Sequence, residues 1–382
     1  MSALLEELNA FTEIKMAVAT VYPLPSTHKS IDGVDYYLIS QHKNRVFPDF
    51  ESKYIPQCLK LINQVKPDLI HIHGTEKFYG MLGKHISGIP IIVSMQGLIG
   101  PCSEWFNYYG NINITEIIKM ETVRRFLNGS SPFRGYVKLK KRQKRETMIL
   151  QLNTHFVGRT DWDRSYVAAH NRQASYCSIP RILRKEFYNH LWSLDAAQSH
   201  RIFISNCRGP RSGADLMLKA FGIIKEYYPD STLYIAGSNS AGEDSYQRYL
   251  LKLAKSYIGS CYFTGYLNPA ELVDQFCKAH VFVHPTYIDN SPNSLAEAQV
   301  LGVPSVISST GGKMSMVDHG KTGLLFPNGD KYLLADRVLQ FFESDELIQK
   351  INQSTIIVAR ERHDPKSIME KYLSLYKKIT HN

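Results

Sequence analysis

Two acidic residues that could do chemistry, Asp289 and Glu297, lie eight positions apart in the stretch YIDNSPNSLAEAQVLGVPSVISSTGG, residues 287–312. The residues between them are typical of a helix start, because Ser291 suits the N-cap and Pro292 the first helical position. Gly302 suits the position just after the helix, where a left-handed backbone is common. The free N–H groups and positive dipole end of such a helix favour an anion such as phosphate.

The second acid, Glu297, shares one face of this predicted helix with Val300 and Leu301, which indicates that it is partly buried. A buried carboxylate needs hydrogen-bond donors, and the hydroxyl groups of a ribose would supply them. The alternative is structural: Glu297 pairs with a nearby lysine or arginine, and Asp289 caps the loop.

Two more glycine-containing turns follow predicted strands. The segment NCRGPRSGADLML follows RIFISN and contains Arg208 and Arg211, and SSTGGK follows VPSVIS and contains Lys313. In open α/β sheets, ligands bind beyond the carboxyl ends of the strands. Three such loops at neighbouring strand ends predict a site for a diphosphate.

The elements that position these loops alternate between short apolar strands and helical patterns, which is typical of parallel sheets covered by helices. The chain has 382 residues, enough for two doubly wound domains joined near 182–200. The expected strands lie in KMAVATVYP, VDYYLIS, DLIHIHG, PIIVSMQG and HFVGRT in the first half, and in RIFISN, TLYIAG, CYFTGY, HVFVHP, VPSVIS and GLLFP in the second.

Composition narrows the class of protein further. No run of about 18 apolar residues is present, and the six cysteines form no CxxC pair, which favours a reduced cytosolic protein without a structural zinc. The net charge of +10 favours an anionic partner. The most basic segment, residues 134–147, is either a solvated helix face or a contact with an anionic membrane surface. Nucleic acid ranks behind both, because no aromatic-interleaved RNA motif or zinc finger accompanies the charge.

Residues 281–327 resemble the donor-binding signature of the retaining glycosyltransferases of family 4, in which two acids eight positions apart precede a helix, a GVP and a GG loop. The SPNSLAEA segment is similar to members that act in bacterial capsule and exopolysaccharide synthesis. The resemblance extends through PDLIHIHGTE, VSMQG, FVGRTDWDRSYV and RHDPKSIMEKYLSLYKKI. It implies an α/β GT-B fold, with two Rossmann-like domains facing a cleft. The expected units are an acceptor-side domain (1–187), a donor domain (188–363) and a helix packing back on the first domain (364–382).

The resemblance also implies roles for individual residues. The residues expected at the reacting centre are Asp289, Gln96, Arg208 and Arg211. Those expected to bind the nucleotide-sugar donor are Asn290, Ser291, Asn293, Ser294, Leu295, Glu297, Gly213 and Tyr266. Those expected on the acceptor side are Gly74, His73 and Arg159. No metal and no cofactor are expected, because cations and a helix N-terminus stabilise the leaving group.

Three departures from the family pattern stand out. Ser212-Gly213 replaces the usual Lys-Gly, with Arg211 next to it, and Gln96 replaces a histidine that would lie near the reacting sugar. The chain also begins inside what resembles the first helix, at residues 2–11, so the first strand and its glycine-rich loop are expected to be missing. We therefore expect the chain to be a shortened form of a longer protein, poorly active and prone to aggregate.

The resulting hypothesis is transfer of a sugar, with retention, from a nucleotide diphosphate sugar to a saccharide or lipid-linked saccharide in cell-surface polysaccharide synthesis. The expected location is the cytoplasm, peripheral on the inner face of the membrane. Two alternatives remain: a catalytically impaired homologue that acts as a binding partner, and a nucleotide-sugar epimerase of the same fold.

Other patterns have simpler explanations. Asp161 and Asp163 form a D-x-D motif, but Thr160 and Asp163 are spaced as a capping box. His71 and His73 share a strand face without an evident third metal ligand, so a role in the core or the crevice is favoured. The aromatic segment 102–110 either lines the acceptor cleft or packs in a core.

Overall fold

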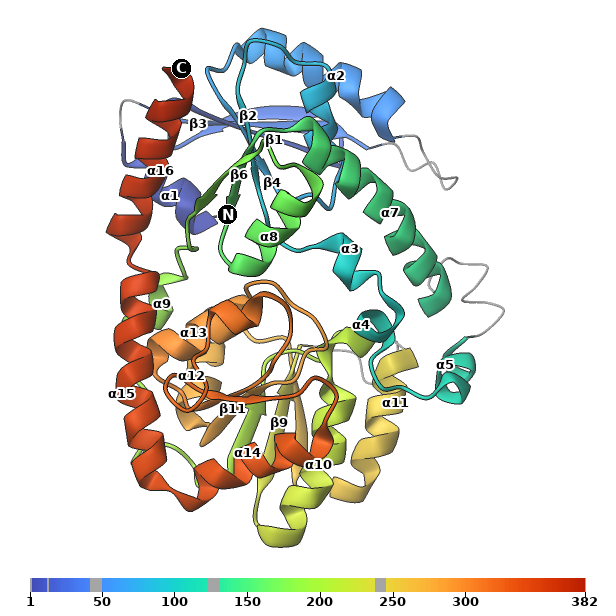
Figure 1. Cartoon of the computed structure of the whole chain (residues 1–382), viewed down its shortest axis with the longest axis vertical. Coiled ribbons are helices and arrows are strands. Elements are labelled where there is room, and N and C mark those ends of the chain that lie inside the picture. Colours follow the sequence, from blue (N-terminus) through green and yellow to red (C-terminus); the bar gives the residue numbers. More distant parts are fainter. Residues whose placement is uncertain (1, 12–13, 42–49, 122–130, 238–244, 382) are drawn as a thin grey trace.

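The computed structural model describes residues 2–11, 14–41, 50–121, 131–237 and 245–381. It has an upper and a lower lobe, each with strands covered by helices (Figure 1). The expected α/β architecture with parallel sheets is confirmed. Across the described ranges, none of the helices has both the length and the apolar character needed to cross a bilayer.

The second lobe contains a parallel sheet in the order β10-β9-β8-β11-β12-β13. This is the doubly wound order, in which the chain starts in the middle and builds outward in both directions. The strands are β8 (Arg201–Ile204), β9 (Thr232–Ala236), β10 (Cys261–Gly265), β11 (Val281–His284), β12 (Ser305–Ser308) and β13 (Leu324–Phe326). The covering helices are α10 (Ala214–Tyr227), α11 (Ser245–Ala254), α12 (Pro269–Lys278), α13 (Asn293–Leu301) and α14 (Lys331–Glu343).

The first lobe divides its strands between two sheets. One has the order β1-β3-β2 and the other, all parallel, the order β4-β5-β6-β7. The strands are β1 (Met16–Tyr22), β2 (Thr27–Ile31), β3 (Val34–Ser40), β4 (Ile70–His73), β5 (Ile91–Ser94), β6 (His155–Gly158) and β7 (Ser175–Ser178). Among the described residues β1 and β4 each pair on one side alone, and Val21 N on β1 donates to the Tyr79 hydroxyl at 2.7 Å.

Two strands were not predicted, β2 and β7. Every residue of β2 is exposed and β7 is a polar edge strand, so neither shows an apolar alternation. The turn between β2 and β3 is Asp32-Gly33, with φ of 50° and 79°. This dipeptide with two positive φ angles is a strong hairpin signal, and the sequence analysis overlooked it.

The helices of the first lobe surround its sheets and reach toward the second. They are α1 (Ser2–Asn9), α2 (Phe50–Val65), α3 (Ile99–Cys102), α4 (Trp105–Tyr109), α5 (Ile114–Met120), α7 (Pro132–Leu152), α8 (Asp161–His170) and α9 (Lys185–Tyr188). The aromatic segment predicted either to line a cleft or to pack does pack. Tyr109 on α4 is 1% exposed within the large core of the second lobe, and Phe106 meets the ring of Tyr287 edge-on.

Two long helices connect the lobes along one side of the molecule (Figure 1). These are α15 (Asp345–Arg362), which packs on α13, and α16 (Pro365–Thr380). In α16, Ile368, Met369 and Tyr372 join a buried cluster with Ile92 and Val157 of the first lobe. The chain therefore ends on the lobe in which it began.

A buried carboxylate on α7 joins several segments of the first lobe by hydrogen bonds. Glu146 is fully buried and accepts four hydrogen bonds. Its donors are the Thr75 hydroxyl (2.6 Å), Ile99 N (3.0 Å), Gly100 N (2.8 Å) and the Tyr166 hydroxyl (3.0 Å). Two of them are first-turn N–H groups of α3, whose N-cap residue Leu98 makes no side-chain cap bond. Glu146 therefore caps α3 from another helix.

We expect Glu146→Ala to lower the free energy of unfolding by about 3 kcal/mol, because it leaves several buried donors without an acceptor. Urea denaturation measures this change. The matched control is Glu104→Ala, which removes a surface ion pair with Lys140 at 3.2 Å and should cost less than about 0.5 kcal/mol. Equal effects of the two substitutions would contradict the capping role.

Candidate active site

The candidate site lies between the lobes, at the point where the strand order of the second sheet reverses. β8 and β11 are neighbours there, and their following loops lead to opposite faces of the sheet. These loops meet the first lobe around a cleft of about 490 Å³. Its lining residues are Glu76, Gln96, Gly97, Arg181, Arg184, Ser205, Asn206, Leu272, His284, Asp289, Ser291, Pro292, Asn293, Ser294 and Glu297.

Helix α13 points its N-terminus at this cleft. The expected cap was wrong by one residue: Pro292 is the N-cap, with extended φ and ψ of −68° and 131°, and the helix begins at Asn293. A proline side chain cannot accept a hydrogen bond, so the first turn has no side-chain cap. Gly302 ends the helix in a left-handed conformation (φ 88°), which confirms the expected stop. The uncapped first turn gives the cleft an anion-binding end.

Glu297 lies in the second turn of α13, and its side chain is 3% exposed. Its Oε1 accepts from Arg184 Nε at 3.0 Å and from Arg184 Nη2 at 2.8 Å. The structural alternative, pairing with an arginine, is therefore what this structure contains. Burial raises the pKa of Glu297 to about 6, and the Arg184 guanidinium opposes that rise. Both arginine contacts use Oε1, which leaves Oε2 without a hydrogen bond among the described residues.

The other acid of the pair, Asp289, caps its own loop, since Oδ1 accepts from Asn290 N at 2.8 Å. Asp289 also lines the cleft. Arg211 lies near enough to act with Asp289 on Cys102: burial raises the pKa of Cys102, Arg211 lowers it and Asp289 adds to the rise. Arg211, which was expected at the reacting centre, therefore lies near Asp289, although it is not among the residues that line the cleft.

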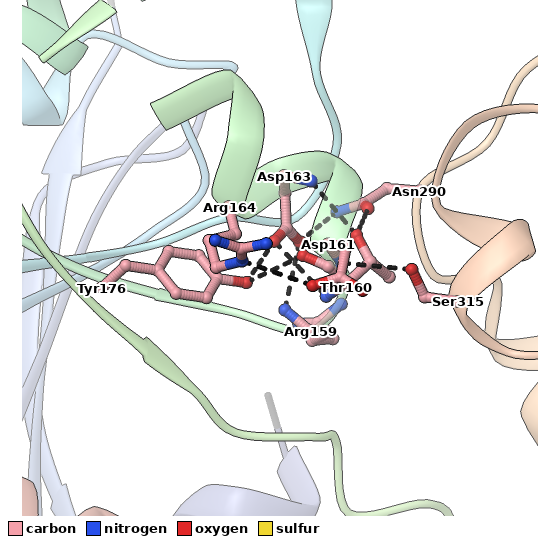
Figure 2. Close-up of polar contacts among 8 residues, drawn as sticks. All are labelled: Arg159, Thr160, Asp161, Asp163, Arg164, Tyr176, Asn290 and Ser315. Atoms are coloured by element: carbon pink, nitrogen blue, oxygen red, sulfur yellow. Dashed lines mark hydrogen bonds and ion pairs between the residues drawn. The ribbon is translucent and has the colours of Figure 1, made fainter. Parts of the chain in front are cut away.

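Asn290 was expected to bind the donor, but its side chain is engaged in a buried contact with the first lobe (Figure 2). Its Oδ1 accepts from the Thr160 hydroxyl at 2.7 Å, and its Nδ2 donates to Asp163 Oδ2 at 2.8 Å. Thr160 and Asp163 form the expected capping box of α8. Asn290 therefore binds the loop between β11 and α13 to the N-terminus of α8. Ser315 adds a second contact by accepting from Asp161 N at 3.1 Å.

Gln96 lies where the cleft meets a second cavity of about 270 Å³. Its Oε1 accepts from Arg159 Nη2 at 3.0 Å and from Arg181 Nη2 at 2.6 Å. The second cavity is lined by Leu4, His73, Gln96, Arg159, Pro180, Arg181, Ile182 and Tyr372. Two of the residues expected on the acceptor side, His73 and Arg159, therefore do lie together. The third, Gly74, has a positive φ of 91°, and a Cβ there would collide with Glu76.

Several residues expected at the reacting centre or at the donor site lie outside the cleft lining. Arg208 is exposed and lies over the ring of Tyr266, with its guanidinium carbon 5.8 Å from the ring centroid. The Leu295 side chain is fully buried, so its backbone alone can reach a ligand. Gly213 has a φ of 69°, and a Cβ there would collide with the carbonyl oxygen of Pro285, so this position requires glycine.

The structure also brings in residues that the sequence analysis did not select, chiefly Glu76, Arg181 and Arg184. The two arginines belong to PRILRKEF, which is separated from the end of β7 by one residue. Position at the carboxyl end of a strand was the signal used for the other loops, and it would have selected this segment as well. β7 was not recognised, so the signal was lost.

The sequence analysis weighed two alternative metal sites, the D-x-D motif and the His71–His73 pair, and Asp163 and His71 both make other contacts. Asp163 is used in the capping box, and His71 has both ring nitrogens engaged, Nδ1 with the Tyr376 hydroxyl (2.7 Å) and Nε2 with the Ser94 hydroxyl (2.6 Å). Within the described ranges no group of three or more potential metal-binding side chains occurs.

Lys313, which contacts the loop between β11 and α13 (residues 285–292), is fully buried. Lys313 Nζ donates to Thr286 O (2.8 Å), to the Thr286 hydroxyl (2.7 Å) and to the Ser308 hydroxyl. These acceptors follow β11 and end β12, so Lys313 joins two of the strand ends that support the cleft. Burial lowers the pKa of Lys313 to about 7, and Asp289 opposes this shift.

Comparison with known proteins agrees with this architecture. Residues 195–357 match the family model of the glycosyl transferases group 1. YqgM, an uncharacterized glycosyltransferase of Bacillus subtilis (strain 168), is 26% identical over 173 residues, which cover 45% of this chain and 47% of that protein. The aligned part is thus less than half of the relative's length.

Two solved structures share the fold over most of the chain. Sucrose-phosphate synthase from Thermosynechococcus elongatus superposes with a TM-score of 0.74 at 15% identity, covering 95% of this chain and 88% of that one. HepE of Anabaena, in complex with UDP and glucose, superposes with a TM-score of 0.65 at 16% identity, covering 91% and 87%. The two lobes and their cleft therefore define a protein of the GT-B fold. Within this fold, the match to the glycosyl transferases group 1 covers residues 195–357, which lie mostly in the second lobe.

The buried ammonium of Lys313 should make stability depend on pH. Its pKa falls from 10.5 to about 7 on folding, so between these values the unfolded chain binds more protons and stability rises with pH. Lys313→Met removes this component. From pH 7 to pH 9 we expect the stability of the unmodified protein to gain about 2 kcal/mol relative to the variant.

Urea denaturation at the two pH values measures this difference, with Lys321→Met, an exposed position, as the control for charge alone. A constant difference between the unmodified protein and Lys313→Met would show that Lys313 keeps its ordinary pKa.

Proposed function

We propose that this protein transfers a sugar from a nucleotide diphosphate sugar to a saccharide or lipid-linked saccharide acceptor, with retention at the anomeric carbon. The observation that carries the proposal is the uncapped N-terminus of α13 in the interlobe cleft, with Glu297 one turn further along the same helix. The family match and the binding of UDP by HepE, a protein of the same fold, support it.

In the proposed complex, the first-turn N–H groups of α13 and the side chain of Ser294 bind the diphosphate, and Glu297 accepts from the ribose hydroxyls. Asp289 faces the hydroxyl groups of the donor sugar. The leaving diphosphate gains negative charge as the glycosidic bond breaks, and Arg208 or Arg211 together with the helix N-terminus stabilise it. Arg181 and Arg184 add positive charge from the first lobe. No divalent metal is needed for this arrangement.

The attack is proposed to come from the acceptor hydroxyl on the same face as the departing diphosphate: the new bond to the anomeric carbon forms as the bond to the diphosphate breaks, and a departing phosphate oxygen takes the hydroxyl proton. Gln96 can donate and accept hydrogen bonds but cannot titrate, so its part is to orient the reacting groups. Two further possibilities stay distinguishable. An epimerase would use the donor without an acceptor, and an impaired homologue would bind the nucleotide without releasing it from the sugar donor.

We further propose that this reaction belongs to cell-surface polysaccharide synthesis at the cytoplasmic face of the membrane, in line with the resemblance of the SPNSLAEA segment to members that act there. Helix α7 has the composition for such contact, with exposed side chains of Lys138, Lys141, Arg142 and Lys144. The start of α7 adjoins α5, since Phe133 N donates to Glu121 Oε1 at 2.8 Å. Exposed apolar side chains lie on both helices: Phe133 (48%), Val137 (38%), Ile114 (61%) and Ile118 (64%). A basic and apolar face of this kind binds anionic bilayers.

Calorimetry with UDP tests the donor site. Glu297→Ala should weaken UDP binding at least tenfold, because it removes an acceptor of charge-assisted hydrogen bonds. Asp289→Ala should leave the affinity for UDP within about twofold and lower the turnover of the sugar donor at least tenfold. Turnover is measured as acceptor-dependent release of the nucleotide diphosphate in excess chelator.

The control for the donor site is Glu343→Ala, at an exposed position at the end of α14 outside the cleft lining. Equal UDP affinities of the Glu297→Ala and Glu343→Ala variants would assign Glu297 a structural role alone. Complete loss of turnover in chelator, restored by a divalent metal, would overturn the metal-free mechanism.

Co-sedimentation with vesicles tests the membrane contact. Vesicles that contain anionic lipid should bind the protein and neutral vesicles should not. Replacing Lys138, Lys141, Arg142 and Lys144 by glutamate should weaken binding at least tenfold, since each basic residue contributes about 1 kcal/mol. The control replaces four exposed lysines of α16 (Lys366, Lys371, Lys377 and Lys378) and changes the net charge equally. The same loss in both variants would mean that net charge acts without a defined face.

A further inference from the structure

The second cavity contains two arginines that lack a carboxylate partner. Arg159 follows β6 and Arg181 follows β7, so both come from strand ends of the first lobe. Neither forms an ion pair with a carboxylate of the described residues. Instead both donate to the uncharged Oε1 of Gln96. A buried or half-buried charge is ordinarily paired with an opposite charge. Neither guanidinium group has such a partner here, which favours the binding of an anion.

The remaining donors of the pair are only partly used. Arg181 Nη1 donates to Asn293 Oδ1, whereas Arg159 Nη1 is shielded from solvent and has no acceptor among the described residues. The nearest acids have other partners. Asp163 accepts from Thr160 and Tyr176, and Glu76 accepts from Gly97 N at 3.2 Å. Asp163 and Glu76 raise the pKa of Arg159, and Glu297 and Asp289 raise that of Arg181, but none of these acids forms an ion pair with either guanidinium group.

Electrostatics of the cavity agree with this inventory. The pKa of Arg181 is lowered to about 10, first by burial and then by the neighbouring Arg159, while Glu297 and Asp289 oppose part of the shift. Burial also lowers the pKa of His73 to about 4, with contributions from both arginines. Both shifts come first from burial and then from neighbouring positive charge, and an anion bound between the arginines would raise both pKa values.

We propose that the second cavity binds a phosphate group carried by the acceptor, between Arg159 and Arg181 and beside His73. This proposal rests on the proposed transferase function. Gln96 and Arg181 line both cavities, so a ligand here lies across Gln96 from Asp289 and α13, where the acceptor would approach a bound donor. A phosphate offers more acceptor oxygens than a carboxylate and carries up to two negative charges near neutral pH, which suits two guanidinium groups.

The test is calorimetry with inorganic phosphate on the protein saturated with UDP, which keeps phosphate out of the donor site. The unmodified protein should bind phosphate. Arg159→Met should weaken this binding about 10- to 100-fold, as expected for loss of charge-assisted hydrogen bonds, and Arg159→Lys should restore part of it. Arg181→Met should have a similar effect. Arg164→Met is the control, because this arginine is exposed on α8 and pairs with Asp161 at 3.3 Å.

The UDP affinity of each variant reports folding and the donor site separately. If UDP fails to bind, the proposed donor function fails, and titration of the nucleotide-free protein with phosphate still decides the phosphate site. Unchanged phosphate binding in Arg159→Met and Arg181→Met, or no phosphate binding by the unmodified protein, would overturn the proposal. So would an equal loss in Arg164→Met.

The phosphate could belong to a soluble sugar phosphate or to a lipid. Glycerol 3-phosphate and dihexanoyl phosphatidic acid below its micelle concentration carry the same phosphate monoester with and without acyl chains. Competition of both with inorganic phosphate supports the site. Tighter binding of the lipid assigns it to lipid-linked acceptors, and equal binding assigns it to soluble ones. Failure of both to compete would overturn it.

Discussion

The geometry of the cleft depends on one buried contact between the lobes, that of Asn290 with Thr160 and Asp163 (Figure 2). Asn290 directly follows Asp289 and lies three residues before α13, so fastening its amide fixes the loop that carries the donor-side groups. Asp163 is fully buried, and its oxygens accept from Arg159 N, Thr160 N, Asn290 and Tyr176. Breaking this network would leave a buried carboxylate without part of its donors, which is costly.

The same contact joins the two cavities. Asn290 Nδ2 also lies 3.4 Å from the carbonyl oxygen of Gln96, whose side chain receives Arg159 and Arg181. Asp163 binds the backbone of Arg159, so the helix start that holds the donor loop also positions one of the cavity arginines. A cluster of short polar side chains thus helps to place the donor side and the acceptor side relative to each other, alongside the apolar packing of α4 on the second lobe and of α16 on the first.

Charge distribution follows from this placement. Arg181 and Arg184 come from the segment after β7 and enter the cleft from the first lobe, where Arg184 pairs with Glu297 of the second lobe. Glu297 accepts a hydrogen bond from Arg184, and Gln96 accepts one from Arg181. Together with the uncapped end of α13, these groups make the interlobe space favourable for phosphate-containing ligands on both sides of Gln96. Lys313 donates hydrogen bonds to Thr286 and Ser308, and it thereby connects the loop between β11 and α13 to the end of β12.

The sequence by itself determined the local features. The capping box at Thr160, the stop at Gly302 and most of the strands follow from turn chemistry and apolar runs that involve neighbouring residues. The sequence analysis did not predict β2 and β7, because their exposed or polar residues show no apolar periodicity. Only the tertiary structure decided the partners of the functional side chains. Glu297 meets Arg184 across 113 positions, and Asn290 meets Asp163 across 127. Such contacts arise from the way in which sheets and lobes pack, and spacing along the chain does not encode them.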